Sequence, residues 1–465
     1  MKISQVCCIG AGYVGGPTMA VIAHECPDIF VYVVDDDKEK IKAWNSQNLN
    51  DLPIYEPGLK KIIKKTRNKN LIFSTDTDKA ILDSQIIFLA VNTPTKLKGQ
   101  GKGFAADLTN IENCAKRIAR ISKSNKIVVE KSTLPVRTAE KIKEVLKSKN
   151  KKIKFEVLSN PEFLAEGTAI EDLYKSDRVL IGGENSPSGK EAIEKLVNIY
   201  KRWIPEKKIL RTNVWSSELS KLASNAMLAQ RISSINSLSA LCEQTGASIS
   251  ELSKAVGLDK RIGSEFLSTS VGFGGSCFQK DILNLVYLCK VYGLKEVAEF
   301  WHQVVKINDY QKKRFTKQIL KTFENSVVGI EILILGWAYK KNTNDSRESA
   351  SIYVSTDLLE KGAILSIYDP MVKKERIKLD LKMVLEKRKN DKPQVKKILN
   401  NVHIVKKLND KQLKCKCILI LTEWDEFKEI NWDKLLMNDK KYPIVFDGRN
   451  IIRKKYLRKI YSIGE

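Results

Sequence analysis

The sequence predicts an α/β protein in which two doubly wound parallel-sheet domains are joined by a central helical domain with one long helix. Three observations indicate this fold. Strand-like runs alternate with amphipathic segments over residues 1–212, helical periodicity dominates residues 213–325, and the alternation returns over residues 326–465. A chain of 465 residues is also too long for one ordinary hydrophobic core, so several domains are expected.

The N-terminal part contains short runs rich in β-branched and other apolar residues. Amphipathic segments separate these runs, as expected where helices connect the strands of a parallel sheet. We therefore expect residues 1–212 to form one domain. The runs cover residues 5–10, 31–35, 71–75, 86–91, 126–132 and 155–160.

The central part begins with a long segment of helical periodicity. Asn213 or Ser216 can cap the start of this helix, and Gly246 can end it. The sequence "SISE" at 248–251 is a capping box, which predicts a further helix ending at Gly257. One apolar stripe of the long helix is formed by Leu219, Leu222, Ala226 and Ala229.

The C-terminal part returns to strand-like runs. Between them, the lysine-rich stretch at 373–414 has the weakest pattern, and we expect it to be the least ordered part. Residues 326–465 are therefore predicted to form a second α/β domain. The strand-like runs cover residues 331–337, 365–370, 417–422 and 443–449.

The composition excludes several classes of protein. No run of about 18 apolar residues is present, so no membrane span is expected. The first residues lead directly into a strand pattern without the apolar region of a signal peptide, which favours a cytoplasmic protein. The nine cysteines have no regular spacing, as is typical of free thiols in a reducing compartment. Because the three histidines form no cluster, we expect no metal, and acid–base chemistry must rely on Asp, Glu, Lys or water.

The net charge of +26 is compatible with two kinds of protein. One kind binds nucleic acid, and the other has a lysine-rich surface without such a partner. The lysines are scattered along the whole chain and are not interleaved with aromatic residues. We therefore expect no nucleic-acid partner.

The sequence "IGAGYVGG" contains a dinucleotide-binding fingerprint. Gly10, Gly12 and Gly15 form G-x-G-x-x-G between a predicted strand and a predicted helix, where backbone N–H groups can reach a pyrophosphate. Asp35 ends the next strand and can accept hydrogen bonds from a ribose 2′-hydroxyl, which favours NAD over NADP. The pattern predicts a Rossmann-like domain. FAD fits the same architecture, but the cysteine site described below favours NAD as the cofactor.

The sequence "SVGFGGSCFQKD" at 270–281 places Cys277 after a glycine-rich turn. If a helix starts near Ser276, the thiol lies in its first turn, where the positive helix end favours the thiolate. Asp281 follows four residues later on the same helix face. A buried structural cysteine remains the alternative.

Further polar residues follow strands or share a helix face. Lys221 and Asn225 are four residues apart in the long helix and lie off its apolar stripe, so they form either a functional face or a solvated one. Glu162 and Glu166 follow the strand at 155–160, at the sheet edge where open α/β sheets bind ligands. "VNTPT" at 91–95 and "EKSTLPV" at 130–136 follow strands in the same way.

Taken together, these stretches resemble the UDP-glucose/GDP-mannose dehydrogenase family, and within it the eukaryotic UDP-glucose 6-dehydrogenases. The resemblance implies oxidation of UDP-glucose at C6 to UDP-glucuronate with reduction of two NAD, through a cysteine thiohemiacetal and thioester. It extends over essentially the whole chain. The matching motifs, in order, are "IGAGYVGGPT", "LPIYEPGL", "VNTPTK", "SNPEFLAEGTAI", "WSSELSKLASNA", "QRISSINS", "VGFGGSCFQKD", "SRESASIY" and "FDGRN".

The resemblance also implies roles for six residues. Cys277 would be the nucleophile, Lys221 would stabilise the developing oxyanion, and Asn225 would orient the C6 oxygen. Asp281 and Thr133 would position a proton-relaying water. Glu162 would act in thioester hydrolysis as base or water-positioning group.

Two binding sites follow from the same resemblance. The implied cofactor residues are Gly10, Ala11, Gly12, Tyr13, Val14, Gly15, Asp35, Lys40, Val91, Asn92, Thr93, Ser132, Thr133, Glu166 and Arg347. The resemblance also implies a homo-oligomer, either a dimer or a hexamer built from dimers, in which Arg261 reaches the substrate from a neighbouring subunit. The other implied substrate residues are Glu162, Phe163, Leu164, Ala165, Glu166, Lys221, Asn225, the 267–274 loop with Leu267, Phe273 and Gly274, and Tyr339, Lys340 and Arg449.

Three positions depart from the family pattern: Ser268 stands where a lysine is expected, Trp337 where Phe is usual, and Asn344 where Gly is usual. The substrate prediction has two alternatives. A related enzyme acting on UDP-N-acetylmannosamine or GDP-mannose would keep the glycines and the cysteine. A basic scaffold or nucleic-acid-binding protein that inherited the fold would bind polyanions in a salt-sensitive way and produce no NADH.

Overall fold

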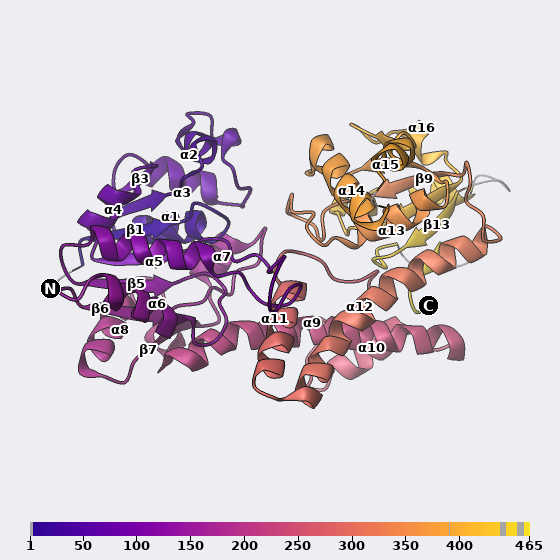
Figure 1. Ribbon diagram of the computed structural model, residues 1–465. Helices are drawn as coiled ribbons and strands as arrows, with labels where there is room; N and C mark the ends of the chain where they lie inside the picture. Colours follow the sequence, from indigo (N-terminus) through magenta and orange to yellow (C-terminus); the bar gives the residue numbers. More distant parts are fainter. Residues whose placement is uncertain (1–2, 390, 438–442, 453–459) are drawn as a thin grey trace. The chain divides into compact units, whose positions relative to one another are not determined.

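The computed structural model describes residues 3–389, 391–437, 443–452 and 460–465 (Figure 1). The chain forms two compact units. The first contains Met1–Ser224 and Leu283–Gly293, and the second contains Asn225–Ile282 and Leu294–Glu465. Among the described residues, no helix combines the length and the apolar character that crossing a membrane requires.

The first unit is built on an eight-stranded sheet in the order β3-β2-β1-β4-β5-β6-β7-β8. All neighbouring strands are parallel except β6 and β7. The order reverses between β1 and β4, which is the switch point where doubly wound sheets bind ligands. The strands are β1 (Gln5–Ile9), β2 (Phe30–Val34), β3 (Leu71–Ser74), β4 (Ile86–Leu89), β5 (Lys126–Glu130), β6 (Phe155–Ser159), β7 (Val179–Gly183) and β8 (Ile209–Asn213).

Helices cover both faces of this sheet. In β1, Val6 and Cys8 join one buried apolar cluster, whereas Cys7 and Ile9 join another. Successive strand side chains point to opposite faces, so the two clusters are the cores on the two sides of the sheet. The helices are α1 (Gly15–Glu25), α2 (Lys38–Asn45), α3 (Leu59–Thr66), α4 (Thr77–Asp83), α5 (Thr109–Ile121), α6 (Thr138–Lys149), α7 (Ala169–Tyr174) and α8 (Pro187–Tyr200), with 3₁₀ turns η1 (Leu49–Asp51) and η2 (Glu206–Lys208).

The second unit contains a six-stranded parallel sheet in the order β11-β10-β9-β12-β13-β14. Its central strand β9 is buried from Ile332 to Leu335. The two doubly wound sheets confirm the predicted fold class. The strands are β9 (Glu331–Leu335), β10 (Ile364–Tyr368), β11 (Val402–Ile404), β12 (Cys417–Ile420), β13 (Ile444–Asp447) and β14 (Ile460–Ser462), and the helices beside them are α13 (Ala350–Glu360), α14 (Lys374–Lys389), α15 (Lys392–Leu399), α16 (Asp410–Leu413), α17 (Asp425–Lys428) and α18 (Trp432–Met437).

The described residues of the lysine-rich stretch at 373–414 form regular elements, although the sequence predicted the least ordered part here. They form α14, α15, β11 and α16. Ile377, Leu381 and Leu385 are buried at successive i, i+4 positions of α14, so a narrow apolar stripe anchors a helix whose other faces are charged. The abundance of lysine obscured this stripe in the sequence.

Four helices make up the central part of the chain: α9 (Val214–Thr245), α10 (Ile249–Gly257), α11 (Phe278–Val291) and α12 (Lys295–Thr322). The predicted caps are confirmed. Oδ1 of Asn213 accepts a hydrogen bond from the Ser216 N–H at 2.8 Å, and Gly246 follows the last residue of α9 with a φ of 76°. The predicted apolar stripe is wrong at Leu219, whose side chain is exposed, whereas Leu222 is fully buried.

Candidate active site

The glycine-rich loop lies between β1 and α1 and is shaped for close approach. A Cβ at Gly15 would lie 2.0 Å from the carbonyl oxygen of Gly10, so only glycine fits there. A Cβ at Gly12 would meet nothing within 4 Å, so this point of the loop faces open space at the start of α1. Among the described residues, no side chain caps α1. The loop therefore fits the pyrophosphate of a dinucleotide, which the helix N-terminus would bind.

Asp35 holds the same loop from the end of β2. Its Oδ2 accepts hydrogen bonds from the Ala11 N–H and from Nζ of Lys40, both at 2.9 Å, and its Oδ1 accepts from the Asp37 N–H at 3.1 Å. Burial raises the pKa of this carboxyl, but the hydrogen bonds outweigh burial, with that from Lys40 first, and the net shift is downward. Asp35 is therefore a carboxylate at neutral pH, as ribose binding requires.

The loops after β4 and β5 are joined at their functional residues. Oγ1 of Thr93 donates to the carbonyl oxygen of Thr133 at 3.0 Å, and Oγ of Ser132 donates to the carbonyl oxygen of Val91 at 2.7 Å. Asn92 accepts at its carbonyl oxygen from Asn110 Nδ2 at 3.0 Å. The fold thus brings together, at one sheet edge, residues that lie about 40 positions apart.

Glu162 and Lys221 form a buried ion pair in the first unit. Nζ of Lys221 lies 3.2 Å from Oε1 of Glu162, and the exposed fractions of the two side chains are 5% and 7%. Oε2 of Glu162 accepts from the Leu164 N–H at 2.8 Å. The Lys221 ammonium also lies 5.6 Å from the ring centroid of Phe163. The alternative of a solvated helix face is therefore wrong for Lys221, which contacts the loop after β6.

The loop that carries Ala165 and Glu166 is fixed by a residue that the sequence analysis did not assign. Glu56, in the motif "LPIYEPGL", accepts hydrogen bonds from the N–H groups of Gly167 and Ala169 at 2.8 and 3.0 Å. It is buried, and both of its oxygens are used. An acidic residue between two prolines in an otherwise apolar motif was the available signal.

In the second unit, Cys277 lies at the entrance to α11. The helix begins at Phe278, and the carbonyl oxygen of Cys277 accepts from the Asp281 N–H at 2.8 Å. The helix thus starts two residues later than the predicted start near Ser276, and Cys277 directly precedes its first turn. Its Sγ lies 3.5 Å from Oγ of Ser276, and the side chain is partly exposed. This position disfavours the alternative of a sealed structural cysteine.

Asn225 and Asp281 form a buried pair in the same unit as Cys277. Nδ2 of Asn225 donates to Oδ2 of Asp281 at 2.6 Å, and Nζ of Lys280 lies 3.7 Å from Oδ1. Both members of the pair are at most 5% exposed. Because Asp281 lies one helical turn after Cys277, a polar pair in this position can hold a water or a substrate oxygen.

Polar residues on α9 and α12 clamp the loop that precedes Cys277. Oδ1 of Asn236 accepts from Oγ1 of Thr269 and from the Ser270 N–H, both at 2.9 Å. Asn308 bonds both backbone groups of Phe273, at 2.8 and 3.0 Å. These buried amides could not be predicted from the sequence, because an asparagine in a helix gives no signal of its partner.

Gly274 and Leu267 mark the two ends of this loop. A Cβ at Gly274 would lie 2.6 Å from the carbonyl oxygen of Glu348, so the loop packs too closely for any other residue. Leu267 is buried in a small cluster with Ile235 and Ile249. The side chain of Leu267 is therefore part of the core, and only its backbone remains for the predicted substrate contact.

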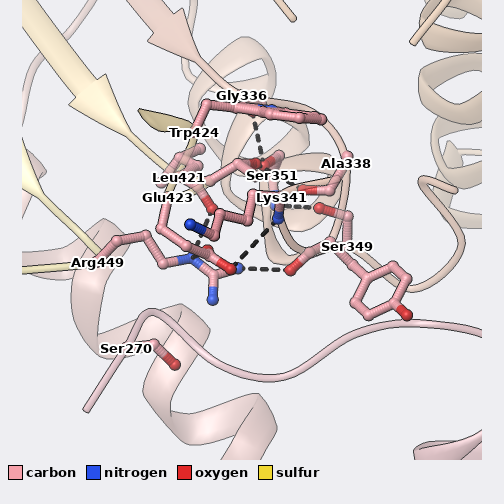
Figure 2. Close-up of polar contacts among 12 residues, drawn as sticks. Ser270, Gly336, Ala338, Lys341, Ser349, Ser351, Leu421, Glu423, Trp424 and Arg449 are labelled. Carbon is pink, nitrogen blue, oxygen red and sulfur yellow. Dashed lines mark hydrogen bonds and ion pairs between the residues drawn. The ribbon is translucent and has the colours of Figure 1, made fainter. Parts of the chain in front are cut away.

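Arg449 connects the loops that follow β9, β12 and β13, and Figure 2 shows it beside Leu421 and Glu423. Its Nε donates to the carbonyl oxygen of Leu421 at 2.8 Å, its Nη2 donates to that of Tyr339 at 2.8 Å, and Nε lies 3.4 Å from Oε2 of Glu423. Nζ of Lys340 lies 5.9 Å from the Tyr339 ring centroid. The fold thus places two cations and a tyrosine in one part of the second unit.

Two predicted arginines are engaged by neighbouring carboxylates. Arg347 forms an ion pair with Asp345 at 2.7 Å within the second unit. Arg261 is 89% exposed in its side chain and pairs with Asp259 at 2.6 Å.

Among the departures from the expected family pattern, Trp337 is fully buried, and its Nε1 donates to Oδ2 of Asp380 at 3.1 Å.

The predicted residues fall into two groups. The first unit carries the glycine-rich loop, Asp35, Lys40, the 91–93 and 132–133 loops, the 162–166 loop and Lys221. The second unit carries Asn225, Arg261, the 267–274 loop, Cys277, Asp281, Tyr339, Lys340, Arg347 and Arg449. Each group is assembled from segments far apart in the sequence.

Comparison with known proteins identifies the family. Residues 4–204 match the NAD binding domain of the UDP-glucose/GDP-mannose dehydrogenase family, residues 215–310 its central domain, and residues 333–454 its UDP binding domain. These matches confirm the expected NAD cofactor.

Similar proteins agree with this assignment. "UDP-glucose 6-dehydrogenase 5" of Oryza sativa subsp. japonica is 54% identical over 99% of this chain and 97% of its own length, and "UDP-glucose 6-dehydrogenase 1" of Glycine max is similar to the same extent. A solved UDP-glucose dehydrogenase from Pyrobaculum islandicum has a TM-score of 0.80 and 29% identity, covering 99% of this chain and 97% of that one. The chain belongs to the UDP-glucose/GDP-mannose dehydrogenase family.

Proposed function

We propose that this NAD-dependent enzyme oxidises UDP-glucose at C6 to UDP-glucuronate, with two NAD reduced per turnover. The observation that carries the proposal is the position of Cys277, partly exposed at the entrance to α11 and one turn before the buried Asn225–Asp281 pair. The 54% identity to plant UDP-glucose 6-dehydrogenases supports UDP-glucose as the substrate.

The mechanism assigns a separate task to each residue. NAD bound at the glycine-rich loop would supply the hydride acceptor, with a separate NAD for each of the two hydrides that leave C6. Lys221 stabilises the C6 alkoxide, Asn225 orients the C6 oxygen, and Asp281 with Thr133 positions the water that takes the alcohol proton. The thiolate of Cys277 adds to the aldehyde carbon, and the resulting thiohemiacetal becomes a thioester when the second hydride leaves.

Hydrolysis of the thioester completes the reaction. Glu162 removes a proton from water, the water oxygen attacks the carbonyl carbon, and the carbon–sulfur bond breaks to release the Cys277 thiolate. Glu162 is held for this task by its bond from the Leu164 N–H and its ion pair with Lys221. The reaction consumes one UDP-glucose, two NAD and one water.

We propose a binding mode in which Tyr339, Lys340 and Arg449 bind the nucleotide end of the substrate and the 267–274 loop binds the sugar. Cations suit a diphosphate, and Lys340 and Arg449 lie in one part of the second unit. Arg261 would reach the substrate of a neighbouring subunit. Its high exposure supports this proposal. The remaining substrate and cofactor residues named from the family resemblance keep their proposed roles.

We also propose the wider organisation of the protein. Three domains would span residues 1–212, 213–325 and 326–465, and the chain would act in the cytoplasm as a homo-oligomer, either a dimer or a hexamer built from dimers. No nucleic-acid partner is proposed. Sedimentation analysis at several protein concentrations tests the oligomer.

A stoichiometry assay tests the proposed reaction. Purified protein is incubated with limiting UDP-glucose and excess NAD, and NADH and UDP-glucuronate are quantified. Two NADH per UDP-glucose consumed is the expected result, whereas one NADH would mean that the aldehyde leaves the enzyme. UDP-N-acetylmannosamine and GDP-mannose are assayed in parallel. Turnover of one of them without turnover of UDP-glucose would overturn the substrate assignment, and no NADH from any would overturn the enzymatic one.

A further inference from the structure

A buried lysine that the proposed mechanism does not use lies beside its functional loops. Lys131 directly follows β5 and is 4% exposed. Its Nζ donates to Oδ1 of Asn160 at 3.1 Å and to the Tyr200 hydroxyl oxygen at 3.3 Å, and it lies 5.7 Å from the Tyr200 ring centroid. The ammonium is therefore fixed by two polar groups in the interior of the first unit.

The partners of Lys131 connect the two loops that carry Thr133 and Glu162. On one side, the N–H groups of Lys131 and Ser132 both donate to the carbonyl oxygen of Leu89, at 2.9 and 3.0 Å. On the other side, Asn160 directly follows β6 and lies two residues before Glu162. A single side chain thus spans from the start of one functional loop to the start of the next.

Asn160 is itself held firmly in place. Its N–H donates to the carbonyl oxygen of Glu130 at 2.9 Å, and its Nδ2 donates to that of Leu180 at 2.8 Å. Its Oδ1 accepts from the Tyr200 hydroxyl at 2.7 Å in addition to Lys131. Every polar group of Asn160 other than its carbonyl oxygen is therefore engaged, and the backbone leading to Glu162 starts from a fixed point.

The charged and titratable groups that face Lys131 come from four elements. They are Cys8 on β1, Tyr200 on α8, Glu162 after β6 and Lys221 on α9. The pKa of Lys131 is lowered to about 8, chiefly by burial; the charges of Glu162 and Cys8 partly oppose this shift, and the charge of Lys221 adds to it. Burial raises the pKa of Cys8 to about 12, and burial also raises that of Tyr200, so both remain neutral at physiological pH.

Local packing does not require this charge. An ammonium in the interior destabilises the folded state, and well-packed apolar replacements of buried charges are often neutral or stabilising. Without Lys131, Oδ1 of Asn160 and the Tyr200 hydroxyl would still bond each other at 2.7 Å. A methionine with a similar unbranched stem would therefore fill the space and leave neither group unpaired.

We propose that Lys131 is a positioning residue, whose ammonium holds the Glu162 loop beside the Ser132–Thr133 loop and orients the Glu162 carboxylate for hydrolysis of the thioester. The inference rests on the proposed function. In that hydrolysis, Glu162 takes the proton of water, the water oxygen bonds to the carbonyl carbon, and the carbon–sulfur bond breaks to release the Cys277 thiolate. Lys131 donates no proton and touches no substrate.

Rapid-mixing kinetics of Lys131→Met test the proposal. We expect a fast burst approaching two NADH per site, followed by steady-state turnover at least about tenfold slower than that of the wild type, because hydride transfer is retained and hydrolysis is slowed. The KM for UDP-glucose and the melting temperature should not worsen. In the wild type, turnover should fall as the pH rises through about 8, because the Lys131 ammonium is lost. This fall is the alkaline limb of the pH–rate profile, and it should vanish in the variant.

Lys126→Met is the matched control. Lys126 begins the same strand, is also buried, and donates to the carbonyl oxygens of Leu82 and Ser84 at 2.8 and 2.6 Å, at the far end from the loops. Its replacement orphans those two oxygens, so it should lower the melting temperature and leave the kinetics without a burst. The two variants thus separate a loss of stability from a loss of positioning.

Several results would contradict the proposed role of Lys131. Wild-type turnover by Lys131→Met, or a slow variant without a burst, would overturn the inference. If Lys131→Met does not fold, Tyr200→Phe takes its place: losing the hydroxyl acceptor should move the alkaline limb to lower pH, and an unmoved limb would overturn the inference. Absence of NADH from the wild-type enzyme with UDP-glucose would instead be the failure of the proposed function, and the inference would fall with it.

Discussion

The side-chain nitrogen of Asn225 donates a hydrogen bond to the carboxylate of Asp281 at 2.6 Å, although the two residues are separated by 56 positions in the chain. A carboxylate can only accept, so the contact fixes which end of the Asn225 amide faces Asp281. Both side chains are buried, and Asp281 lies one helical turn after Cys277. The pair therefore gives the region around the thiol a defined polar geometry before any substrate binds.

Replacing Asp281 by Asn should reveal this geometry. The substitution keeps the shape, removes the charge and the acceptor, and allows the Asn225 amide to turn. We expect kcat to fall on the order of 10²-fold with a small change in KM, because the group acts on the reacting water. Steady-state kinetics with UDP-glucose check this. A variant with normal kcat would remove Asp281 from the proposed chemistry.

Replacing Cys277 by Ser should abolish steady-state turnover. A serine hydroxyl is a much weaker nucleophile toward the aldehyde, so the sequence of two oxidations is interrupted after the first. NADH formation and intact-protein mass spectrometry follow the reaction. The control is Cys289→Ser in α11, which changes a buried thiol and should leave turnover intact. Turnover by Cys277→Ser at the wild-type rate would eliminate the covalent step.

Replacing Asp35 by Ala should reduce the preference for NAD over NADP. The wild-type carboxylate would repel a 2′-phosphate and also pairs with Lys40 at 2.9 Å. Without Asp35, the Lys40 ammonium is released from that pair and can attract the phosphate. We expect the ratio of kcat/KM for the two cofactors to shift toward NADP by about tenfold or more, or roughly 1.4 kcal/mol. An unchanged ratio would contradict the role of Asp35.

Replacing Gly274 by Ala should displace the loop before Cys277. The new Cβ would lie 2.6 Å from the carbonyl oxygen of Glu348, a backbone atom that cannot move cheaply. Overpacking of this kind typically costs about 1–3 kcal/mol. We expect a lower melting temperature and a higher KM for the nucleotide sugar, with little change in NAD binding. Thermal unfolding and isothermal titration measure the two effects, and an unaltered KM would show that the loop tolerates the shift.

The buried carboxyl of Glu130 should make the stability of the fold depend on pH. Burial, and then the charge of Glu218, raise the pKa of this fully buried carboxyl well above its ordinary value. The folded state therefore binds a proton more tightly than the unfolded chain, and the contribution of Glu130 to stability falls as the pH rises above about 4.5. Glu130→Gln should raise the free energy of unfolding by about 1–3 kcal/mol at neutral pH, because it removes this dependence.

Denaturant titrations of Glu130→Gln and the wild type at several pH values check this sign. The difference between them should grow from mildly acidic to alkaline pH and shrink near pH 4, where Glu130 is largely protonated in the folded and the unfolded wild type alike. A difference that is constant across the range would mean that Glu130 does not change its protonation differently on folding.

Much of the architecture could be predicted from local pattern. Apolar strands between amphipathic segments defined both sheets, and Asn213 and Gly246 marked the ends of the long helix, because capping and strand periodicity depend on near neighbours in the chain. Other features escaped. The strands at Val179–Gly183, Ile209–Asn213, Val402–Ile404 and Ile460–Ser462 were not separated from their surroundings, and the lysines of α14 masked its apolar stripe.

The sequence by itself determined the kind of chemistry: glycines for a pyrophosphate, an aspartate for a ribose, and a thiol at a helix entrance. Only the tertiary structure decided which side chains meet. Lys221 reaches Glu162 across 59 positions, Asn225 reaches Asp281, and Lys131 lies buried between two loops. The physical reason is that residue type and spacing act locally, whereas burial and long-range hydrogen bonds arise only when the sheets and helices have packed.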